Sequence, residues 1–307
     1  MRSTAGNRWR FASRRGGGAR RSGGRRASGD EPTPPFSAVS SDGAVKYADV
    51  IPEHELAERV RHYYTRYYRD TLGIPDWAAH VAHREAEDRH ERARLPRLRA
   101  LVGDALARGP VLNLGCGTGG FNVAAEEAGA RVVGVDADPD AIAICELKRR
   151  VRGGRYVRAA AEALPFRDGA FALVHCFSVI EHVESVERAV GEMVRVTRPG
   201  GALYVHTPNA WSLFEGHYKI FWIPFLPAPL ARVYLRVRGR PTPYLAHLRR
   251  LTVRRLAAAF RRAGVTALEL AAGDPPRESV GPLRTLAAAY YRLTRVTPFI
   301  ELVARKA

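Results

Sequence analysis

The residues most suited to chemistry lie between Val111 and Gly120, where a short apolar run ends in a cluster of glycines. This pattern predicts a buried strand whose end opens into a turn, with bare backbone N–H groups aimed at a ligand. The glycines fit two templates. Gly115, Gly117 and Gly120 match the dinucleotide pattern GxGxxG, whereas Gly115, Gly117 and Gly119 match the GxGxG of methyl-donor sites. The loop alone therefore leaves two kinds of ligand open.

An acidic residue follows the loop at the spacing of a ribose contact. The next apolar run ends at Asp136, which lies 21 residues after Gly115. At that distance a carboxylate accepts hydrogen bonds from the hydroxyls of a ribose. Nicotinamide dinucleotides and S-adenosylmethionine both carry such a ribose, so this acid does not separate the two candidates.

Three later segments distinguish between the two candidate ligands. AEALPF begins at Ala161 after the third predicted strand, FSVIEHV begins at Phe177 after the fourth, and RPGG begins at Arg198 just before the fifth. With these segments in this order, residues 108 to 210 resemble the class I S-adenosylmethionine-dependent methyltransferases. The resemblance is closer to the small-molecule branch that contains the ubiquinone and menaquinone methyltransferases, and it covers the flanks of the chain only loosely.

The resemblance implies that S-adenosylmethionine is the cofactor, and it assigns residues to the parts of that molecule. The glycine loop would wrap the methionine part, Asp136 would hold the ribose, the segment from Ala161 would border the adenine, and the end of the fourth strand would line the pocket. The residues so assigned are Asn113, Gly115, Cys116, Gly117, Asp136, Ala161, Glu162, Phe177 and Ser178.

The chain departs from the family at three positions that often carry Asp, namely Asn113, Ala160 and Ala172. Asn113 can still accept a hydrogen bond from the donor's ammonium group, but without charge assistance. Ala160 removes the usual carboxylate for the adenine amino group. We therefore expect weaker donor binding, and a non-catalytic binder of S-adenosylmethionine stays open as an alternative.

Methyl transfer from a sulfonium needs alignment in a dry pocket more than it needs a catalytic side chain. If the acceptor is a hydroxyl, a base beside it would help, and the resemblance offers His182 for this role. His217 lies in the segment where many such enzymes build the acceptor wall. The alternatives are that Glu181 and His182 orient the following helix and that His217 lies on a surface loop, whereas His206 is expected to pack.

Apolar runs that alternate with helical segments predict an α/β fold, namely a Rossmann-like, doubly wound and mostly parallel sheet of about seven strands. N-terminal helices precede the sheet, and a lid is inserted after the fifth strand. The expected strands are 111–114, 131–136, 155–158, 171–177, 202–207, 265–270 and an edge strand at 299–304. The expected helices are 53–71, 77–94, 97–107 after a break at Pro96, 120–127, 141–150, 185–196, 253–262 and 282–296.

Five regions follow from this pattern. We expect a disordered basic tail at 1–35, a helical cap at 36–107, the cofactor-binding core at 108–207, an apolar and basic lid at 208–250, and a completion of the core at 251–307. The tail holds nine arginines and almost no large apolar groups, so it cannot bury enough surface to order itself. A solvated linker, or a start codon assigned too early, is the explanation that we prefer, and binding to RNA or anionic lipid is the alternative.

The composition excludes several classes of protein. Three cysteines without paired spacing indicate neither a disulfide framework nor a zinc site, and His80, His83 and His90 have no carboxylate at ligand spacing. No metal site is therefore expected. The chain shows no signal peptide and no apolar run of about 20 residues, so we expect a cytoplasmic protein.

The net charge of +18 and a pI near 10.6 raise the alternative of a nucleic-acid methyltransferase. The excess charge lies at the two ends of the chain, without a recognisable RNA-binding module, so nucleic acid is not the partner that we expect. The apolar segment 218–231 precedes Arg232, Arg236, Arg238 and Arg240, and the helix at 282–296 has an apolar face with Leu283, Leu286, Tyr290 and Leu293.

Apolar and basic residues side by side are typical of docking at the inner face of an anionic membrane, through 218–240 and 282–296. Packing of both segments within the protein or on a second subunit is the alternative. In either case a small hydrophobic or lipid-linked acceptor, methylated on a hydroxyl or a carbon, fits better than a nucleotide.

Overall fold

The computed structural model describes residues 52–271 and 284–307, so the expected basic tail lies outside the described residues, as does Leu283. The strands of the main sheet are β1 (Pro110–Leu114), β2 (Arg131–Asp136), β3 (Arg155–Arg158), β4 (Phe171–Phe177), β5 (Thr197–Pro208), β8 (Ala267–Leu270) and β9 (Phe299–Arg305). The helices of the core are α4 (Gly120–Glu127), α5 (Pro139–Arg152), α6 (Val186–Val196) and α8 (Val253–Arg262).

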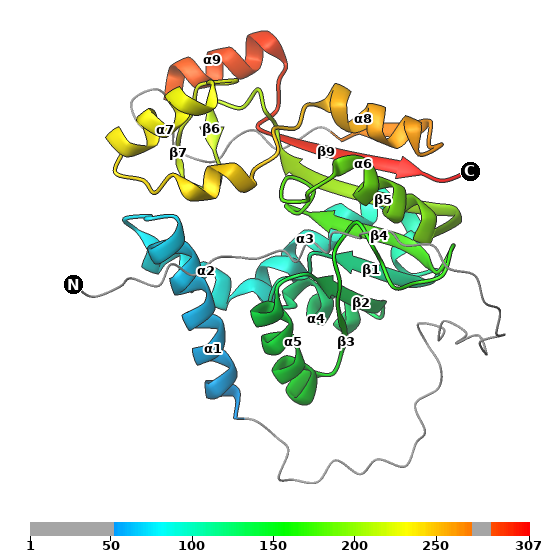
Figure 1. Cartoon of the computed structure of the whole chain (residues 1–307). Coiled ribbons are helices and arrows are strands. Elements are labelled where there is room, and N and C mark those ends of the chain that lie inside the picture. Colours follow the sequence, from blue (N-terminus) through cyan, green and yellow to red (C-terminus); the bar gives the residue numbers. More distant parts are fainter. Residues whose placement is uncertain (1–51, 272–283) are drawn as a thin grey trace, which may run out of the picture.

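The seven strands form one sheet in the order β3-β2-β1-β4-β5-β9-β8 (Figure 1). Strands β1 to β5 are parallel, and β9 is antiparallel to both of its neighbours. The predicted Rossmann-like α/β fold is therefore confirmed. The prediction of an edge strand at 299–304 is wrong, because β9 lies inside the sheet and β8 forms the edge. Ile300, Leu302 and Ala304 are buried, which explains why this apolar strand takes an inner position.

Helices cover both faces of the sheet, and successive strand residues point to opposite faces. Val111 packs in the cluster formed with helix α4 and the N-terminal helix α3 (Glu87–Val102). Its neighbour Leu112 packs in the cluster formed with α6 and α8 on the other face. The ends of the parallel strands consequently open between two helical layers, where α/β folds bind their ligands.

In the described part of the chain, three helices precede the sheet: α1 (Glu53–Thr65), which continues as a π-helical turn η2 (Arg66–Thr71), α2 (Trp77–Glu85) and α3 (Glu87–Val102). A short 3-10 helix, η3 (Gly103–Leu106), leads from α3 to β1. The predicted break at Pro96 is wrong, because the chain breaks at Ala86 and α3 runs through the proline. Leu95, Leu98 and Val102 are buried on both sides of Pro96, so their packing offsets the lost helical hydrogen bond.

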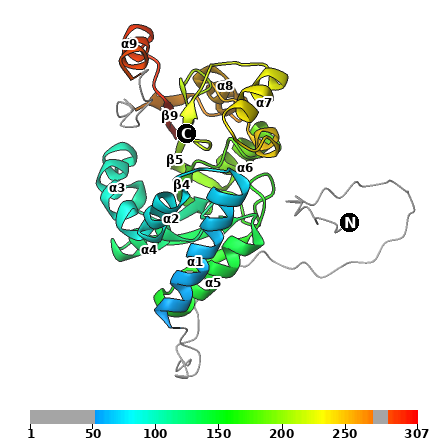
Figure 2. The same ribbon diagram turned by 90° about the vertical axis from the view of Figure 1, so that its left-hand side faces the viewer.

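The lid contains a hairpin of β6 (Phe214–Glu215) and β7 (Ile220–Phe221), the helix α7 (Ala228–Val237) and a 3-10 helix, η4 (Pro243–His247). Figures 1 and 2 show α9 (Arg284–Thr294) at the same end of the molecule as the lid. Pro227 precedes α7 and Pro229 lies in its first turn, positions where proline favours a helix. Within the described residues, no helix is long and apolar enough to cross a membrane.

The inner side of the lid packs on the N-terminal helices. Tyr218, Ile220 and Trp222 of the lid share one buried cluster with Val60 and Tyr64 of α1. Polar contacts join the same two regions: the Tyr67 and Tyr244 hydroxyls lie 2.9 Å apart, and an Nη1 of Arg240 donates to the carbonyl of Gly73. The lid is thus held over the strand ends from the side of α1.

Candidate active site

The backbone of the glycine loop shows which of its glycines have a left-handed conformation. Gly115, Gly117 and Gly119 have φ values of +69°, +53° and +87°, whereas Gly120 is the first residue of α4 and has an ordinary helical conformation. The residues that need left-handed backbone are therefore those of GxGxG. A Cβ on Gly115 would lie 2.1 Å from a methyl carbon of Val179, so no larger residue fits there.

Asp136 lies at the end of β2 and is joined to the glycine loop. One carboxylate oxygen accepts a hydrogen bond from the Gly117 N–H at 2.9 Å, and the other accepts from the Asp138 N–H at 2.9 Å. Burial raises the pKa of Asp136 to about 6, against the opposing effect of these backbone donors. A carboxylate oxygen has more than one lone pair, so both can still accept from a ribose diol.

The loop is also held by a buried polar cluster that the sequence did not reveal. The Thr118 hydroxyl lies 2.7 Å from both carboxylate oxygens of Glu87, and the Lys148 ammonium lies 2.8 Å from one of them. The Tyr64 hydroxyl contacts the same threonine at 3.1 Å. These residues come from α1, α3, the loop and α5, so no spacing in the sequence relates them.

Two of the residues assigned to the donor are engaged within the protein. Asn113 is buried, with its amide nitrogen donating to Asn122 at 2.8 Å and its oxygen 2.9 Å from a ring nitrogen of His175. Glu162 accepts hydrogen bonds from the backbone N–H groups of Glu184 and Ser185, at the start of α6. Glu162 thus orients that helix, a task for which the sequence offered Glu181 and His182. Donor contacts of Asn113 and Glu162 stay predictions.

The remaining assigned residues lie around the same strand ends. Cys116 and Ala161 are buried, and the thiol of Cys116 has a raised pKa, first because of its contact with the Cys145 thiol and then because of burial. Ser178 has a φ of +55°, which is unusual for a residue other than glycine and is a strained conformation of the kind found at functional sites. Its N–H donates to the carbonyl of His206 on β5.

A cavity of about 220 Å³ opens beside Phe177 and Ser178, at the end of β4. Its walls are formed by β4, β5, β9, the lid and the N-terminal helices. The lining residues are Tyr67, Tyr68, Arg84, Phe177, Ser178, His182, His206, Pro208, Gly216, His217, Lys219 and Phe299. Aromatic rings, histidines and two cationic side chains thus converge next to the predicted donor pocket.

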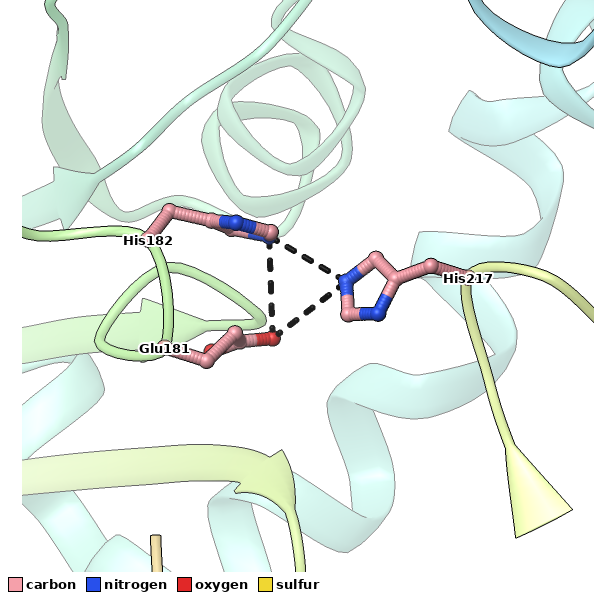
Figure 3. A group of neighbouring side chains, drawn as sticks. All are labelled: Glu181, His182 and His217. Atoms are coloured by element: carbon pink, nitrogen blue, oxygen red, sulfur yellow. Dashed lines mark hydrogen bonds and ion pairs between the residues drawn. The ribbon is translucent and has the colours of Figure 1, made fainter. Parts of the chain in front are cut away.

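The structure brings the two predicted catalytic histidines together in this cavity (Figure 3). The Nε2 atoms of His182 and His217 lie 3.2 Å apart, although 35 positions separate them in the sequence. Burial lowers the pKa of His182 to about 3. Burial also acts to lower the pKa of His217, but the Glu215 carboxylate, 2.9 Å from its Nδ1, outweighs that effect and leaves the pKa raised.

Glu181 completes this group, as Figure 3 shows. Burial raises the pKa of its carboxyl to about 7. One oxygen accepts a hydrogen bond from the Thr207 hydroxyl at 2.9 Å. The other oxygen, Oε1, lies 3.9 Å from Nε2 of His182 and 4.0 Å from Nε2 of His217, and it has no hydrogen-bond partner in the described part of the chain.

Sequence reasoning gave no site role to the other lining residues, among them His206 and Arg84. His206 does pack, as expected, with its ring stacked on Phe177 and on Phe299, but it also lines the cavity. Arg84 of α2 lies beside the Tyr68 hydroxyl at 3.2 Å and faces the same space. The position of His206 near the end of a parallel strand was a usable signal, whereas nothing local to α2 places Arg84 at the site.

Comparison with known proteins agrees with this geometry. Residues 112–205 match the family model of the methyltransferase domain. An uncharacterized methyltransferase of Mycolicibacterium gilvum is 40% identical over 120 residues, which are 39% of this chain and 47% of that protein. A demethylmenaquinone methyltransferase of Thermus thermophilus is 37% identical over 137 residues, or 42% of this chain and 62% of the relative.

The chain spans about half the length of the curated relatives that it matches. Among solved structures, an S-adenosylmethionine-dependent methyltransferase from Mesorhizobium loti aligns with a TM-score of 0.47 and 21% identity, over 70% of this chain and 98% of the other. The family match covers β1 to β5 with the glycine loop and Asp136, the elements that carry the predicted donor contacts. Residues 112–205 therefore match a methyltransferase domain, as the sequence resemblance predicts.

Proposed function

We propose that the protein transfers a methyl group from S-adenosylmethionine to a small acceptor bound in the cavity under the lid. One observation carries this proposal: two neighbouring residues connect the donor loop to the cavity. Val179 packs against Gly115 of the loop, and its neighbour Ser178 lines the cavity. A methyl group presented at the end of β4 would consequently face an acceptor held between β4 and the lid.

Alignment supplies most of the rate in such a transfer, because the sulfonium is a very good leaving group. The glycine loop and Asp136 would fix the donor, while the lid excludes water from the reacting atoms. His182 and His217 are placed to contact the reacting oxygen of the acceptor. These two side chains would position that oxygen in line with the methyl carbon and the sulfur.

The lining of the cavity favours an acceptor with a flat ring that carries oxygen. Tyr67, Phe177 and Phe299 offer ring faces or edges, and Arg84 provides a positive charge close by. A quinol or phenol combines these features, and the relative named as a demethylmenaquinone methyltransferase adds support for a quinone-like substrate. A hydrophobic or lipid-linked tail on such a ring would leave the cavity through the lid.

The outer side of the lid supports a second proposal, that the protein docks on an anionic membrane to reach this acceptor. Eight large apolar side chains are between 43% and 83% exposed and form what we name the apolar rim: Trp211, Ile223, Phe225, Leu230, Val233, Val237, Leu286 and Leu293. The Trp211 and Phe225 rings touch, with centroids 4.4 Å apart, and the Tyr290 hydroxyl of α9 donates to the Trp211 carbonyl.

The charged residues around the apolar rim indicate what binds there. Arg232, Arg236 and Arg238 are exposed on or just after α7, and Arg292 and Arg295 are exposed on or just after α9. Apolar side chains flanked by arginines match the surface of an anionic bilayer, where each basic residue contributes about 1 kcal/mol. Trp222, which the sequence placed in the same surface, is buried against the N-terminal helices and belongs to the fold instead.

Calorimetric titration with S-adenosylhomocysteine tests the donor assignment. We expect one binding site per chain and a much weaker affinity in Asp136→Ala, because the ribose loses its acceptor. NAD⁺ serves as the matched comparison, since it carries the same kind of ribose. Binding of NAD⁺ in place of S-adenosylhomocysteine, or an affinity that ignores Asp136→Ala, would refute the proposal.

A further inference from the structure

The Glu181, His182 and His217 side chains form a triangle whose corners are one oxygen and two nitrogens (Figure 3). Its edges measure 3.2 Å between the two Nε2 atoms and 3.9 and 4.0 Å from these atoms to Oε1 of Glu181. Ligands about 2.1 Å from a tetrahedral ion lie roughly 3.4 Å from one another. One edge is already close to that length, and the other two need to shorten by only about half an ångström.

Neighbouring groups hold the triangle in a ligand-like orientation. His217 directs Nδ1 to the Glu215 carboxylate at 2.9 Å, which leaves its Nε2 facing the centre. Glu215 is itself fixed by the backbone N–H of Tyr218 at 2.6 Å. A histidine that donates its outer N–H to a carboxylate is the usual arrangement behind a metal ligand. On the opposite side, Thr207 binds the outer oxygen of Glu181 and turns Oε1 inward.

The inner oxygen of Glu181 also points to a bound cation, independently of the spacing of the three side chains. The Glu181 side chain is only 2% exposed, and Oε1 has no hydrogen-bond partner among the described residues. Burying a carboxylate oxygen without a partner is costly. A hydrogen bond between the two histidines satisfies only those two rings. A cation at the centre satisfies all three inward-facing atoms at once.

We propose that Glu181, His182 and His217 bind a divalent transition-metal ion at the wall of the acceptor cavity. Two imidazoles and one carboxylate form a ligand set suited to Zn²⁺, and less suited to Mg²⁺, which prefers oxygen ligands. The sequence predicted no metal site, because the third ligand comes from the lid, 35 positions after His182. Both histidines line the cavity, so a free coordination position would face the acceptor.

The role of the ion rests on the proposed function, but its binding does not. An ion that ligates the acceptor's hydroxyl would lower the pKa of that hydroxyl and fix its oxygen in front of the donor. The proton passes to solvent, the new oxygen–carbon bond forms as the carbon–sulfur bond of the donor breaks, and the sulfonium becomes the neutral thioether of S-adenosylhomocysteine. The site therefore predicts an oxygen, rather than a carbon, as the methylated atom.

The test is calorimetric titration of the chelator-treated full chain, without a histidine tag, with Zn²⁺, and optical titration with Co²⁺. We expect one ion per chain and visible absorption bands of coordinated Co²⁺. His217→Ala should weaken Zn²⁺ binding by at least about 100-fold, and Glu215→Gln, which alters only the orienting partner, by about tenfold. His206→Gln is the matched control, because this histidine lines the same cavity outside the triangle, and its Zn²⁺ affinity should stay unchanged.

Binding of S-adenosylhomocysteine to each variant shows that the fold is intact and keeps the two proposals separable. If Zn²⁺ does not bind the wild-type chain, or binds it and His217→Ala equally well, the metal site is refuted. This holds whether or not S-adenosylhomocysteine binds. If Zn²⁺ binds as expected and S-adenosylhomocysteine does not, the metal site stands and the proposed methyl transfer fails. Circular dichroism of His217→Ala distinguishes loss of a ligand from loss of the fold.

Discussion

Lowering the pH should weaken donor binding through one group, Asp136. Its pKa of about 6 means that the carboxylate is nearly fully ionised at about pH 7.5 and only about one tenth ionised at about pH 5. The ribose hydroxyls donate to the ionised form, so binding favours the deprotonated state and is lost as the pH falls. Linkage then predicts an affinity for S-adenosylhomocysteine about tenfold weaker at the lower pH.

The assay is calorimetric titration at several pH values between these limits, with Asp136→Asn as the matched control. The amide keeps the shape of the side chain and an acceptor oxygen but has no charge to titrate. The Asp136→Asn variant should bind roughly 10- to 100-fold more weakly than the wild type at about pH 7.5, the range expected for loss of a charge-assisted hydrogen bond. Its affinity should then stay level across the range. An equally steep pH dependence in the variant would show that another group titrates and would refute this reasoning.

Three other perturbations follow from the packing. Gly115→Ala should abolish binding of S-adenosylhomocysteine and lower the free energy of unfolding by about 1–3 kcal/mol, through a clash and a left-handed φ, as measured by calorimetry and urea denaturation. Glu87→Ala should lower the free energy of unfolding by about 3–5 kcal/mol, because it leaves the buried Lys148 ammonium without its main partner. The double variant Trp211→Ser, Phe225→Ser should reduce sedimentation with anionic vesicles while leaving donor binding unchanged, because both side chains are exposed.

Two of these perturbations have a control within the chain. Gly103 has a similar positive φ without any neighbour in reach, so Gly103→Ala tests strain alone and should retain donor binding. Leu270→Ser removes a comparably exposed apolar residue on β8, outside the apolar rim, and should leave vesicle binding intact. Equal loss of vesicle binding in Leu270→Ser, or none in the rim variant, would contradict docking through the apolar rim. A Glu87→Ala protein as stable as the wild type would contradict the stabilising role of Glu87 in the buried polar cluster.

The central fold was predictable because its signals are local. The strand before Gly115, the acid at the end of the next strand and each helix of the alternation can all be recognised from a short stretch of the sequence. The errors arose where packing outweighed a local rule. Pro96 does not end α3, because apolar residues on both sides of it are buried on the sheet, and β9 is internal because the chain returns antiparallel between β5 and β8.

The site was predictable only in part, for a related reason. His182 and His217 could be named singly, but their contact depends on how the lid folds back over the strand ends. The same holds for Glu87, whose carboxylate meets Thr118 and Lys148 only after three elements pack together. Pairings between distant positions leave no trace in the spacing of one sequence. They become visible only once the topology is known.

Methyl transfer itself is the most direct test of the account. The full chain is incubated with S-adenosylmethionine carrying a deuterated methyl group, together with Zn²⁺ and either a quinol and phenol panel, extracted lipid or RNA, and the products are analysed by mass spectrometry. We predict one deuterated methyl group on an oxygen of a quinol or phenol, and none when Gly115→Ala replaces the wild type. A methylated RNA, or a chain that binds S-adenosylhomocysteine and methylates none of these acceptors, would contradict it.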